Sequence, residues 1–454
     1  MPLARLRALP ALSLVLIGFA LAVAWRFEAR PRLASPKNVI LISLDTLRAD
    51  HLGAWGYERA TSPRLDELAQ KSVVFRRAVA QGGSTIPSHA SLFTSQYPSA
   101  VTGVTSGLLA WPETLAEALS RDGFATWGFV DGGNVRGQFG FAQGFDHYED
   151  DRIGIRKLVK RTKRWLGDHP VPRFFLFLHT YDIHTPYAAP RAYVKLFGDP
   201  DYKGRFHPNT RYFRAAEKRD RPMSARERVE VVARYDAGIR YTDEAIGDFL
   251  DWLDEHGFLD DSLVVVLSDH GEEFLEHGRL GHQQLYLDPN LRVPLVFYQR
   301  GRAPRVVDET VELTDVAPTI LELLGLPPLP DAVGSSLRPA LDGRRLRGPR
   351  IAYSEKGGAP GKQTVVTDRH QLFEDRKSRQ VRLYDLQADP GATRNVSAEQ
   401  PAVKQQLTEE LRRRRKAAGK VRYEHRREER ALSKRQPLRE KVRQELEALG
   451  YLQP

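Results

Sequence analysis

Cysteine is absent from all 454 residues of this chain. Its absence excludes disulfide bonds, thiolate zinc sites and a lipid anchor attached through cysteine. Internal repeats are absent as well. Hydrophobic residues make up 41% of the sequence and charged residues 28%, a balance that is typical of a globular protein with a large core. We therefore expect one large domain with a smaller unit, and not a disordered chain.

The charge balance is strongly basic, with a formal net charge of +11. Such a charge suits a partner whose surface is anionic. Anionic lipid or glycan fits an exported protein better than nucleic acid does, so no nucleic-acid partner is expected. The oligomeric state is left open.

The first residues are typical of an exported protein. Arg5 and Arg7 precede an apolar run over residues 8–25. A basic start followed by such a run predicts a signal peptide or an uncleaved membrane anchor, with a linker up to residue 36. A buried soluble helix is the alternative. We expect a protein of the cell envelope (for example the periplasm), anchored outside the cytoplasm or secreted.

Three apolar runs are each followed by polar, chemically active side chains. The runs cover residues 38–44, 174–178 and 262–267, and continuous runs of this kind indicate central strands buried on both faces of a sheet. Asp45 follows the first run, His179 the second, and Asp269 with His270 the third. The carboxyl ends of parallel strands gather functional groups in open α/β sheets. We expect these side chains to lie close together in the folded protein.

The remaining patterns continue the alternation of helices and strands. We expect further strands or helices at residues 62–80, 126–130, 152–167, 228–253, 291–297 and 311–326. Residues 198–226 are rich in arginine, lysine, proline and aromatics, and we interpret them as an inserted surface loop or a substrate lid. The expected division is a catalytic domain at 37–345, a small C-terminal sheet at 346–400 and a basic helical tail at 401–454.

A glycine-containing loop precedes a helix start at Thr85. Gly82 and Gly83 free the backbone, and Pro87 has the φ angle of a first helical turn. The amino end of a helix favours an anion. A hydroxyl at Thr85 could attack a phosphate- or sulfate-like centre if its pKa were lowered.

This segment carries a family resemblance. Thr-x-Pro-Ser-His-Ala-Ser-Leu at residues 85–92 resembles the nucleophile segment of sulfatases in the alkaline phosphatase superfamily, and the similarity extends over about residues 37–400. It implies an α/β fold with a mixed, mostly parallel sheet flanked by helices and a small C-terminal sheet. Sulfatases oxidise a cysteine or serine two residues before this proline to formylglycine. Here Thr85 stands there, His89 replaces an arginine, and Ser84 is one residue out of register.

These departures argue against the formylglycine route. They favour relatives with a threonine nucleophile, such as phosphoethanolamine transferases, lipoteichoic acid synthases and phosphodiesterases. The resemblance implies a divalent metal held by Asp45, Thr85, Asp269 and His270. Thr46 stands where sulfatases usually have a second acid, so zinc or manganese is favoured over calcium.

A second group of side chains comes from the same segments. His184 and His282 are candidate catalytic residues, as proton donors or in transition-state stabilisation. Together with His179 and Asp182 they could instead hold a second metal or the substrate, and His179 could also be structural. Arg48 could contact substrate or form a salt bridge.

We therefore predict a metal-dependent hydrolase that cleaves phosphoesters, of the phosphodiester or phosphoethanolamine type, through Thr85. The substrate is expected to be an anionic ester linked to lipid or glycan. The alternatives are sulfuric ester hydrolysis, transfer of phosphoethanolamine or glycerophosphate, and, outside enzymes, a basic protein that binds envelope polymers. A single candidate membrane segment favours hydrolysis over transfer.

Overall fold

A computed structural model describes residues 33–103, 107–199, 201–204, 223–348, 350–356, 361–426 and 440–449. The chain divides into Met1–Ser35 and a compact unit, Pro36–Pro454. The apolar run at residues 8–25, on which the prediction of export depends, lies outside the described residues. Within the described ranges, no helix combines the length and the hydropathy that crossing a membrane requires.

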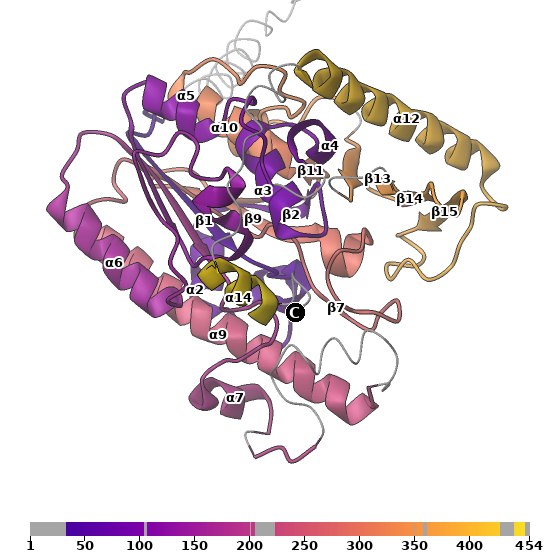
Figure 1. The fold of residues 1–454 in the computed structure, drawn as a ribbon, viewed down its shortest axis with the longest axis horizontal. Coiled ribbons are helices and arrows are strands. Elements are labelled where there is room, and N and C mark those ends of the chain that lie inside the picture. Colours follow the sequence, from indigo (N-terminus) through magenta and orange to yellow (C-terminus); the bar gives the residue numbers. More distant parts are fainter. Residues whose placement is uncertain are drawn as a thin grey trace, which may run out of the picture. The chain divides into compact units, whose positions relative to one another are not determined.

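A nine-stranded sheet forms the centre of the compact unit (Figure 1). Its order is β10-β2-β9-β6-β1-β5-β3-β4, with β11 pairing with β2. All pairings are parallel except those of β9, which runs antiparallel to β2 and β6. The strands are β1 (Asn38–Leu44), β2 (Val73–Val79), β3 (Ala125–Val130), β4 (His147–Glu149), β5 (Phe174–Thr180), β6 (Ser262–Leu267), β9 (Arg292–Gln299), β10 (Arg305–Val307) and β11 (Val311–Glu312).

Helices cover both faces of this sheet, as the alternation of β1 side chains requires. Val39 and Leu41 pack into one apolar cluster, and Ile40 and Ile42 pack into the other. The first face carries α3 (Thr85–Thr94), α4 (Pro98–Val101), α5 (Leu115–Arg121), α10 (Val316–Leu324) and α11 (Arg338–Leu341). The second carries α2 (Pro63–Gln70), α6 (Ile155–Asp168) and α9 (Ala225–Glu255), and α7 (Arg191–Phe197) packs on α9.

A four-stranded antiparallel sheet follows the main domain. Its order is β12-β13-β14-β15, and the strands are Ala352–Glu355, Lys362–Val366, His370–Asp375 and Gln380–Asp385. A two-stranded hairpin, β7 (Glu273–Phe274) with β8 (Leu280–Gly281), lies directly after β6 in the chain. The short helical turns are η1 (Ala49–His51), η2 (Gly53–Trp55), η3 (Gly133–Val135), η4 (Gly137–Phe139), η5 (Leu287–Leu291) and η6 (Leu313–Asp315).

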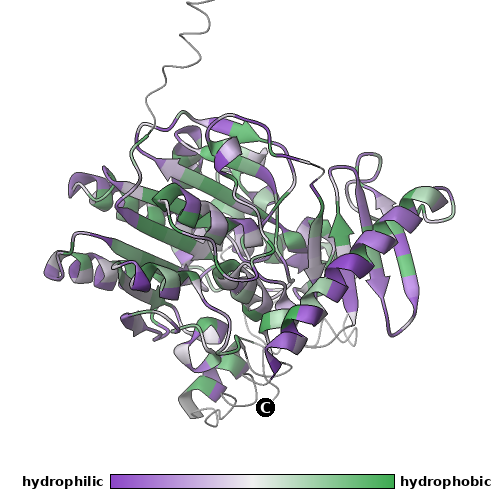
Figure 2. Ribbon diagram, turned by 90° about the horizontal axis from the view of Figure 1, so that it is seen from above, coloured by the Kyte–Doolittle hydropathy of each residue, from purple (hydrophilic) through white to green (hydrophobic). Residues whose placement is uncertain are grey.

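Figure 2 shows the hydrophobic strands lying between helices with hydrophilic outer faces. The central sheet, its flanking helices and the smaller antiparallel sheet confirm the predicted α/β fold. The apolar runs at 38–44, 174–178 and 262–267 are indeed the central strands β1, β5 and β6. Burial on both faces explains why these strands lack alternating polar residues.

The long helix α12 (Pro401–Glu424) packs on the core, although its sequence suggested a charged tail. Leu407, Leu411 and Ala418 are buried, and Arg414 forms an ion pair with Glu312 over 3.1 Å. Figure 1 shows α12 beside β13–β15. The apolar residues of α12 are widely spaced, and the arginine run around 412–415 makes them difficult to recognise in the sequence. This apolar side of the helix contacts α4 and β13. A second C-terminal helix, α14, covers Glu440–Ala448.

The inserted segment 198–226 is described only at 198–199, 201–204 and 223–226. The prediction that it forms a substrate lid therefore lies mostly outside the described residues. The helix expected at 228–253 begins earlier, at Ala225, where the Ser224 hydroxyl accepts the Glu227 N–H and the Glu227 carboxylate accepts the Ser224 N–H.

Leu411 provides a test of how firmly α12 is integrated. We expect Leu411→Ala to lower the free energy of unfolding by about 2–5 kcal/mol, because its side chain is fully buried and its removal leaves a cavity. Denaturant titration followed by circular dichroism measures this loss. Arg412→Ala, on the exposed side of the same helix, is the control and should change it by less than about 0.5 kcal/mol. Equal effects of the two variants would contradict the packing of α12.

Candidate active site at the carboxyl ends of the central strands

Three neighbouring strands bring their polar ends to one level of the sheet. In the register of β1, Ser43 pairs with His179 of β5 and with Leu267 of β6. Asp45 follows β1, and its N–H donates to Thr180 O over 3.1 Å. Asp269 and His270 follow β6. The parallel register therefore places the three groups together, and Asp45, His179, Asp269 and His270 are all fully buried.

The loop between β2 and α3 carries Thr85 to the same place. Gly83 is required here, because a Cβ at this position would lie 2.1 Å from Gln284 O. Thr85 is the first residue of α3. Its hydroxyl donates to Asp45 Oδ2 over 3.2 Å and lies 3.5 Å from His270 Nε2. The helix start predicted from the glycines and the proline thus brings the hydroxyl into contact with the acids.

Asp45, Asp269 and His270 form a group that could hold a metal ion, with one ligand atom of each lying within 4.8 Å of the others. Among the described residues, Asp45 Oδ1 and Asp269 Oδ2 are buried and have no hydrogen-bond partner. Buried carboxylate oxygens without donors are rare unless a cation or water satisfies them. The two orphaned oxygens therefore fit a divalent cation.

His270 has the tautomer that a metal ligand needs. Its Nδ1 lies 2.9 Å from the carbonyl oxygen of Gly271, which can only accept a hydrogen bond. Nδ1 therefore carries the hydrogen, and the lone pair is on Nε2. Nε2 lies 3.4 Å from Asp269 Oδ2 and 4.0 Å from Asp45 Oδ1. The backbone thus orients the imidazole toward both acids.

The two carboxylates differ in their electrostatic surroundings. Burial raises the pKa of Asp45 well above its ordinary value, and the charge of Asp269 raises it further. Burial also acts to raise the pKa of Asp269, but His270, His89 and His179 outweigh it and lower the pKa. The two neighbouring carboxylates therefore favour a proton or a cation between them. A divalent ion would neutralise the charge of both.

Two further histidines support these acids from inside the protein. His89 donates from Nδ1 to Thr85 O over 3.0 Å and lies 3.4 Å from Asp269 Oδ2. His179 Nε2 lies 3.3 Å from Asp45 Oδ2. Burial lowers the pKa of each to about 4, so both rings are neutral near pH 7. His89, which sequence reasoning did not assign to the site, therefore connects α3, the helix that begins at Thr85, to a metal-ligand candidate.

His184 and His282 lie next to the cluster. Their ring centroids are 5.0 Å apart, and His282 is 4.9 Å from His270. His184 Nδ1 lies 2.7 Å from Thr185 O, and His282 Nδ1 lies 3.1 Å from the carboxylate of Glu272. Each ring therefore carries its hydrogen on Nδ1, which places the lone pair on Nε2. Burial lowers the pKa of His184 well below its ordinary value.

Asp182 and Arg48 make other contacts. The carboxylate of Asp182 accepts hydrogen bonds from the N–H of Ile155 over 2.6 Å and from the hydroxyl of Thr180 over 2.8 Å, so it caps α6. The turn after β5 directs this side chain to the helix start. The guanidinium of Arg48 is paired with Asp50 and Glu276, each within 2.8 Å. For Arg48 the structure thus contains the salt bridge that was weighed as the alternative to a substrate contact.

Tyr181 is a residue of the site that the sequence reasoning did not single out. Its phenol is fully buried and accepts the N–H of Asn134 over 2.9 Å. Burial raises the pKa of this phenol well above its ordinary value, while the hydroxyl of Thr85 acts to lower it. It stands between His179 and Asp182 in the chain, where a tyrosine is easily taken for part of the core. Only its position two residues after the end-of-strand histidine could have indicated a role.

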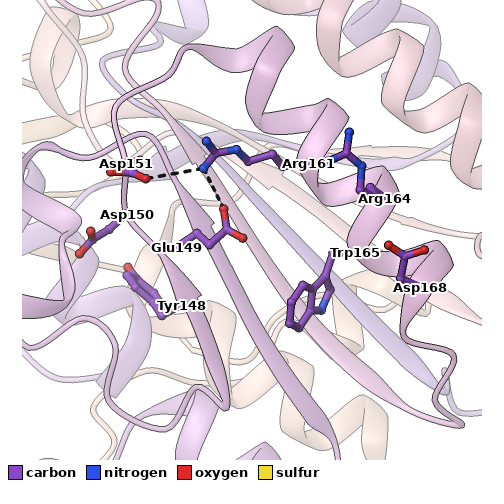
Figure 3. A pocket seen from close by; sticks show the side chains of 8 residues that line it. All are labelled: Tyr148, Glu149, Asp150, Asp151, Arg161, Arg164, Trp165 and Asp168. Carbon is purple, nitrogen blue, oxygen red and sulfur yellow. Dashed lines mark hydrogen bonds and ion pairs between the residues drawn. The ribbon is translucent and has the colours of Figure 1, made fainter.

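A polar hollow elsewhere is lined by β4 and α6 and includes none of these site residues (Figure 3). In it, Arg161 pairs with Glu149 over 3.1 Å and with Asp151 over 3.7 Å. The other lining residues are Tyr148, Asp150, Arg164, Trp165 and Asp168. The outer face of α6 is thus charged and exposed.

Comparison with known proteins identifies the family. The family model described as Sulfatase matches residues 37–326, and the model described as N-sulphoglucosamine sulphohydrolase, C-terminal, matches residues 276–417. The first match covers more than half of the chain and includes all the site residues above. The chain therefore belongs to the Sulfatase family, as the resemblance at residues 85–92 predicted.

Individual relatives extend over most of the chain. An arylsulfatase of Clostridium perfringens is 23% identical and aligns with 79% of this chain and 90% of its own. The multifunctional alkaline phosphatase superfamily protein PehA of Trinickia caryophylli is 26% identical, over 68% of this chain and 76% of its own.

Solved structures have the same fold. The phosphonate monoester hydrolase of Agrobacterium radiobacter superposes with a TM-score of 0.69 at 23% identity, covering 84% of this chain and 96% of its own. A protein solved with its substrate D-glucosamine-2-N,6-O-disulfate gives 0.70 at 18% identity, over 85% and 98%. The relatives and the family match together establish that the chain is an enzyme, a hydrolase of ester bonds.

The cluster predicts metal content. We expect purified protein to contain about one divalent ion per chain, and Asp269→Asn to lose most of it, because one anionic ligand is removed. Elemental analysis by mass spectrometry measures both. Asp168→Asn, an exposed acid in the hollow of Figure 3, is the matched control and should keep the ion. Retention of metal by Asp269→Asn would contradict the assignment of this ligand.

The buried histidines predict acid sensitivity of the metal-free protein. A histidine with a folded pKa of about 4 binds fewer protons in the folded than in the unfolded state between that value and its ordinary pKa of 6.5. The contribution of each histidine to the free energy of unfolding is fully present above pH 6.5. It falls by about 1.4 kcal/mol per pH unit as the pH is lowered toward 4. We expect the unfolding midpoints of His89→Gln to depend less on pH than those of the exposed control His256→Gln. Identical slopes would contradict the neutral, buried His89.

Proposed function

We propose that the enzyme hydrolyses phosphoesters, of the phosphodiester or phosphoethanolamine type, and that the unmodified hydroxyl of Thr85 is the nucleophile. The observation that carries the proposal is the contact of this hydroxyl with Asp45 Oδ2 at 3.2 Å, inside the candidate metal cluster. A cysteine that could be oxidised to an aldehyde is missing from the whole sequence. Thr85 is therefore the group available for attack at this position.

The arrangement supplies the parts of an in-line displacement. A divalent ion held by Asp45, Asp269 and His270 would lower the pKa of the Thr85 hydroxyl and neutralise the charge of the ester. The carboxylate of Asp45 already accepts the hydroxyl hydrogen, so the proton has an acceptor as Oγ1 attacks phosphorus. The bond from Oγ1 to phosphorus forms while the bond to the ester oxygen breaks, and that oxygen leaves with its electron pair.

The leaving oxygen needs a proton, and of the two candidate donors His282 is the better placed to give one from Nε2 when its ring is in the imidazolium form. The carboxylate of Glu272 lies 3.1 Å from His282 Nδ1 and stabilises positive charge on that ring. Burial and the neighbouring His282 favour the neutral form of His184, which suits a hydrogen-bonding role toward the substrate. Water then hydrolyses the phosphothreonine and restores Thr85.

Sulfate ester hydrolysis is the second candidate function. The names of the relatives favour it, whereas the threonine at the proposed nucleophile position does not. The relatives include arylsulfatases and an ulvan-active sulfatase of Formosa agariphila, and one neighbour was solved with a sulfated glucosamine. A net charge of +11 suits either kind of anionic ester on a glycan or lipid. Hydrolysis is preferred to transfer because these relatives are named as sulfatases and hydrolases.

The ligand set and the N-terminal sequence support two further expectations. Two carboxylates, one imidazole and a hydroxyl favour zinc or manganese over calcium, which prefers a larger set of oxygens. The basic residues Arg5 and Arg7 and the apolar run at 8–25 support export to the cell envelope. Elemental analysis and fractionation of cells address these two points directly.

Substitution at Thr85 tests the nucleophile. We expect Thr85→Ala to lose at least about 10³-fold in kcat on an aryl phosphodiester, because the attacking oxygen is removed, and Thr85→Ser to retain part of it. Each variant is assayed on aryl phosphodiester, phosphomonoester, phosphonate and sulfate ester. Thr94→Ala, which removes a hydroxyl bonded to Ala90 O in the same helix, is the matched control and should keep its activity.

The outcomes separate the candidates. Turnover of sulfate ester alone, lost in Thr85→Ala, would replace the phosphoester proposal with a sulfatase that uses unmodified threonine. Full turnover by Thr85→Ala on every substrate would overturn the nucleophile itself.

A further inference from the structure

His282 begins a segment that has no regular secondary structure. Residues 282–286 of the described structure follow β8 and form neither a helix nor a strand. His282 itself lies 3.1 Å from the carboxylate of Glu272, and the N–H of Gln283 donates to Gly83 O over 2.6 Å. The other backbone polar groups of such a segment need partners from outside it when they are withdrawn from water. The residues that supply these partners help to determine where the ring of His282 lies.

Gln371, in β14 of the small sheet, supplies two of these partners. Its Nε2 donates to Leu285 O over 2.7 Å, and its Oε1 accepts the N–H of Leu287 over 3.2 Å. A carbonyl oxygen can only accept and an N–H can only donate, so these two contacts fix the orientation of the amide. The same Nε2 donates to the Thr364 hydroxyl in β13 over 3.0 Å. The fully buried Gln371 therefore joins the small sheet to the segment on both sides of Tyr286.

The same face of the small sheet contacts the segment at two further points. The register of β13 and β14 places the side chains of Lys362, Gln371 and Phe373 on one face. Lys362 Nζ donates to Gln284 Oε1 over 3.2 Å. The rings of Tyr286 and Phe373 are nearly parallel, with centroids 6.0 Å apart. Three neighbouring side chains of one sheet thus hold successive residues of the segment that follows His282.

We propose that Gln371 is a positioning residue, which holds the segment after His282 and thereby keeps the proton on His282 Nε2 within reach of the leaving oxygen. The inference rests on the proposed function, in which the imidazolium form of His282 protonates that oxygen. As the bond from phosphorus to the ester oxygen breaks, its electron pair stays on the oxygen. The oxygen takes the Nε2 proton and leaves as an alcohol, and the imidazole becomes neutral. Gln371 acts through the segment and exchanges no proton.

The leaving group of the substrate separates this role from general structural support. The weakly basic 4-nitrophenolate leaves as an anion and gains little from a proton donor, whereas the more basic phenolate depends on one. A positioned general acid contributes about 10²–10⁴-fold to the rate, and a displacement of about 1 Å can remove about 10²-fold. A general loss of folded enzyme would instead lower the rates with both leaving groups by the same factor.

The full-length, metal-loaded Gln371→Leu protein, assayed on methyl phenyl phosphate and methyl 4-nitrophenyl phosphate, tests this. We expect kcat/KM, which includes the step that expels the leaving group, to fall by at least about 10-fold on the phenyl ester and by less than about 3-fold on the nitrophenyl ester. The metal content should be unchanged.

Gln363→Leu is the matched control. Gln363 is a buried glutamine on the opposite face of the same sheet, where its Nε2 donates to Glu355 over 3.3 Å and its Oε1 accepts from Arg415 over 2.9 Å. It makes none of the contacts to the segment that Gln371 makes. Gln363→Leu should therefore leave the ratio of the two rates unchanged.

His282→Gln on the same two esters distinguishes failure of the inference from failure of the proposed function. A selective loss on the phenyl ester in His282→Gln but not in Gln371→Leu would overturn the role of Gln371 and leave the proton donor in place. No selective loss in His282→Gln would overturn the assigned proton donor and this inference with it. If Gln371→Leu does not fold, Gln371→Asn replaces it, because a side chain one methylene shorter draws the amide away from Leu285 and Leu287. An unchanged ratio of the two rates in that variant would overturn the inference.

Discussion

The buried pair of carboxylates, Asp45 and Asp269, is the constraint on which the rest of the site depends. Two acids that are withdrawn from water cannot both be charged without a compensating cation, and each has an oxygen without a hydrogen-bond partner in the described structure. The surrounding residues contact the two acids. His270 presents its lone pair to both acids, His89 and His179 contact them from inside the protein, and the N–H of Thr46 donates to Asp269. A divalent ion would complete the arrangement.

The same pair bears on the proposal that the chain departs from the family's usual nucleophile. The fold and the family match are those of sulfatases, yet threonine stands at the nucleophile position and histidine four residues later. His89 is neutral near pH 7 and contacts both Thr85 O and Asp269, so the helix that begins at Thr85 is connected to a ligand candidate. The hydroxyl of Thr85 donates to the carboxylate of Asp45 over 3.2 Å and lies 3.5 Å from His270 Nε2. An unmodified alcohol in this setting has a carboxylate as a proton acceptor.

Much of the fold could be predicted because its central strands are buried on both faces. Such strands consist of continuous apolar runs, and β1, β5 and β6 were recognised in this way together with the polar residues at their ends. Prediction from the sequence was less accurate for a helix that is rich in charged residues and also packs on the core. The arginines of α12 indicated a charged tail, but Leu411 and its apolar neighbours bury that helix against the domain. Short-range patterns could not reveal that Asp182 caps α6, because its partner Ile155 lies 27 residues away in the chain.

By itself, the sequence determined the α/β class and the family, because each depends on patterns of residues that are close along the chain. The lack of cysteine, also a property of the sequence alone, set this chain apart from the common sulfatase chemistry. The tertiary structure decided which side chains meet. Thr85 and Asp45 are 40 residues apart and Thr85 and His270 are 185 apart. The parallel register of β1 and β6 brings Asp45 and His270 together, and the loop between β2 and α3 carries Thr85 to them. The hydrogen bond from the Asn134 N–H to the phenol of Tyr181 was likewise set by the fold, because a hydrogen bond depends on the position and orientation of both partners and not on their spacing in the chain.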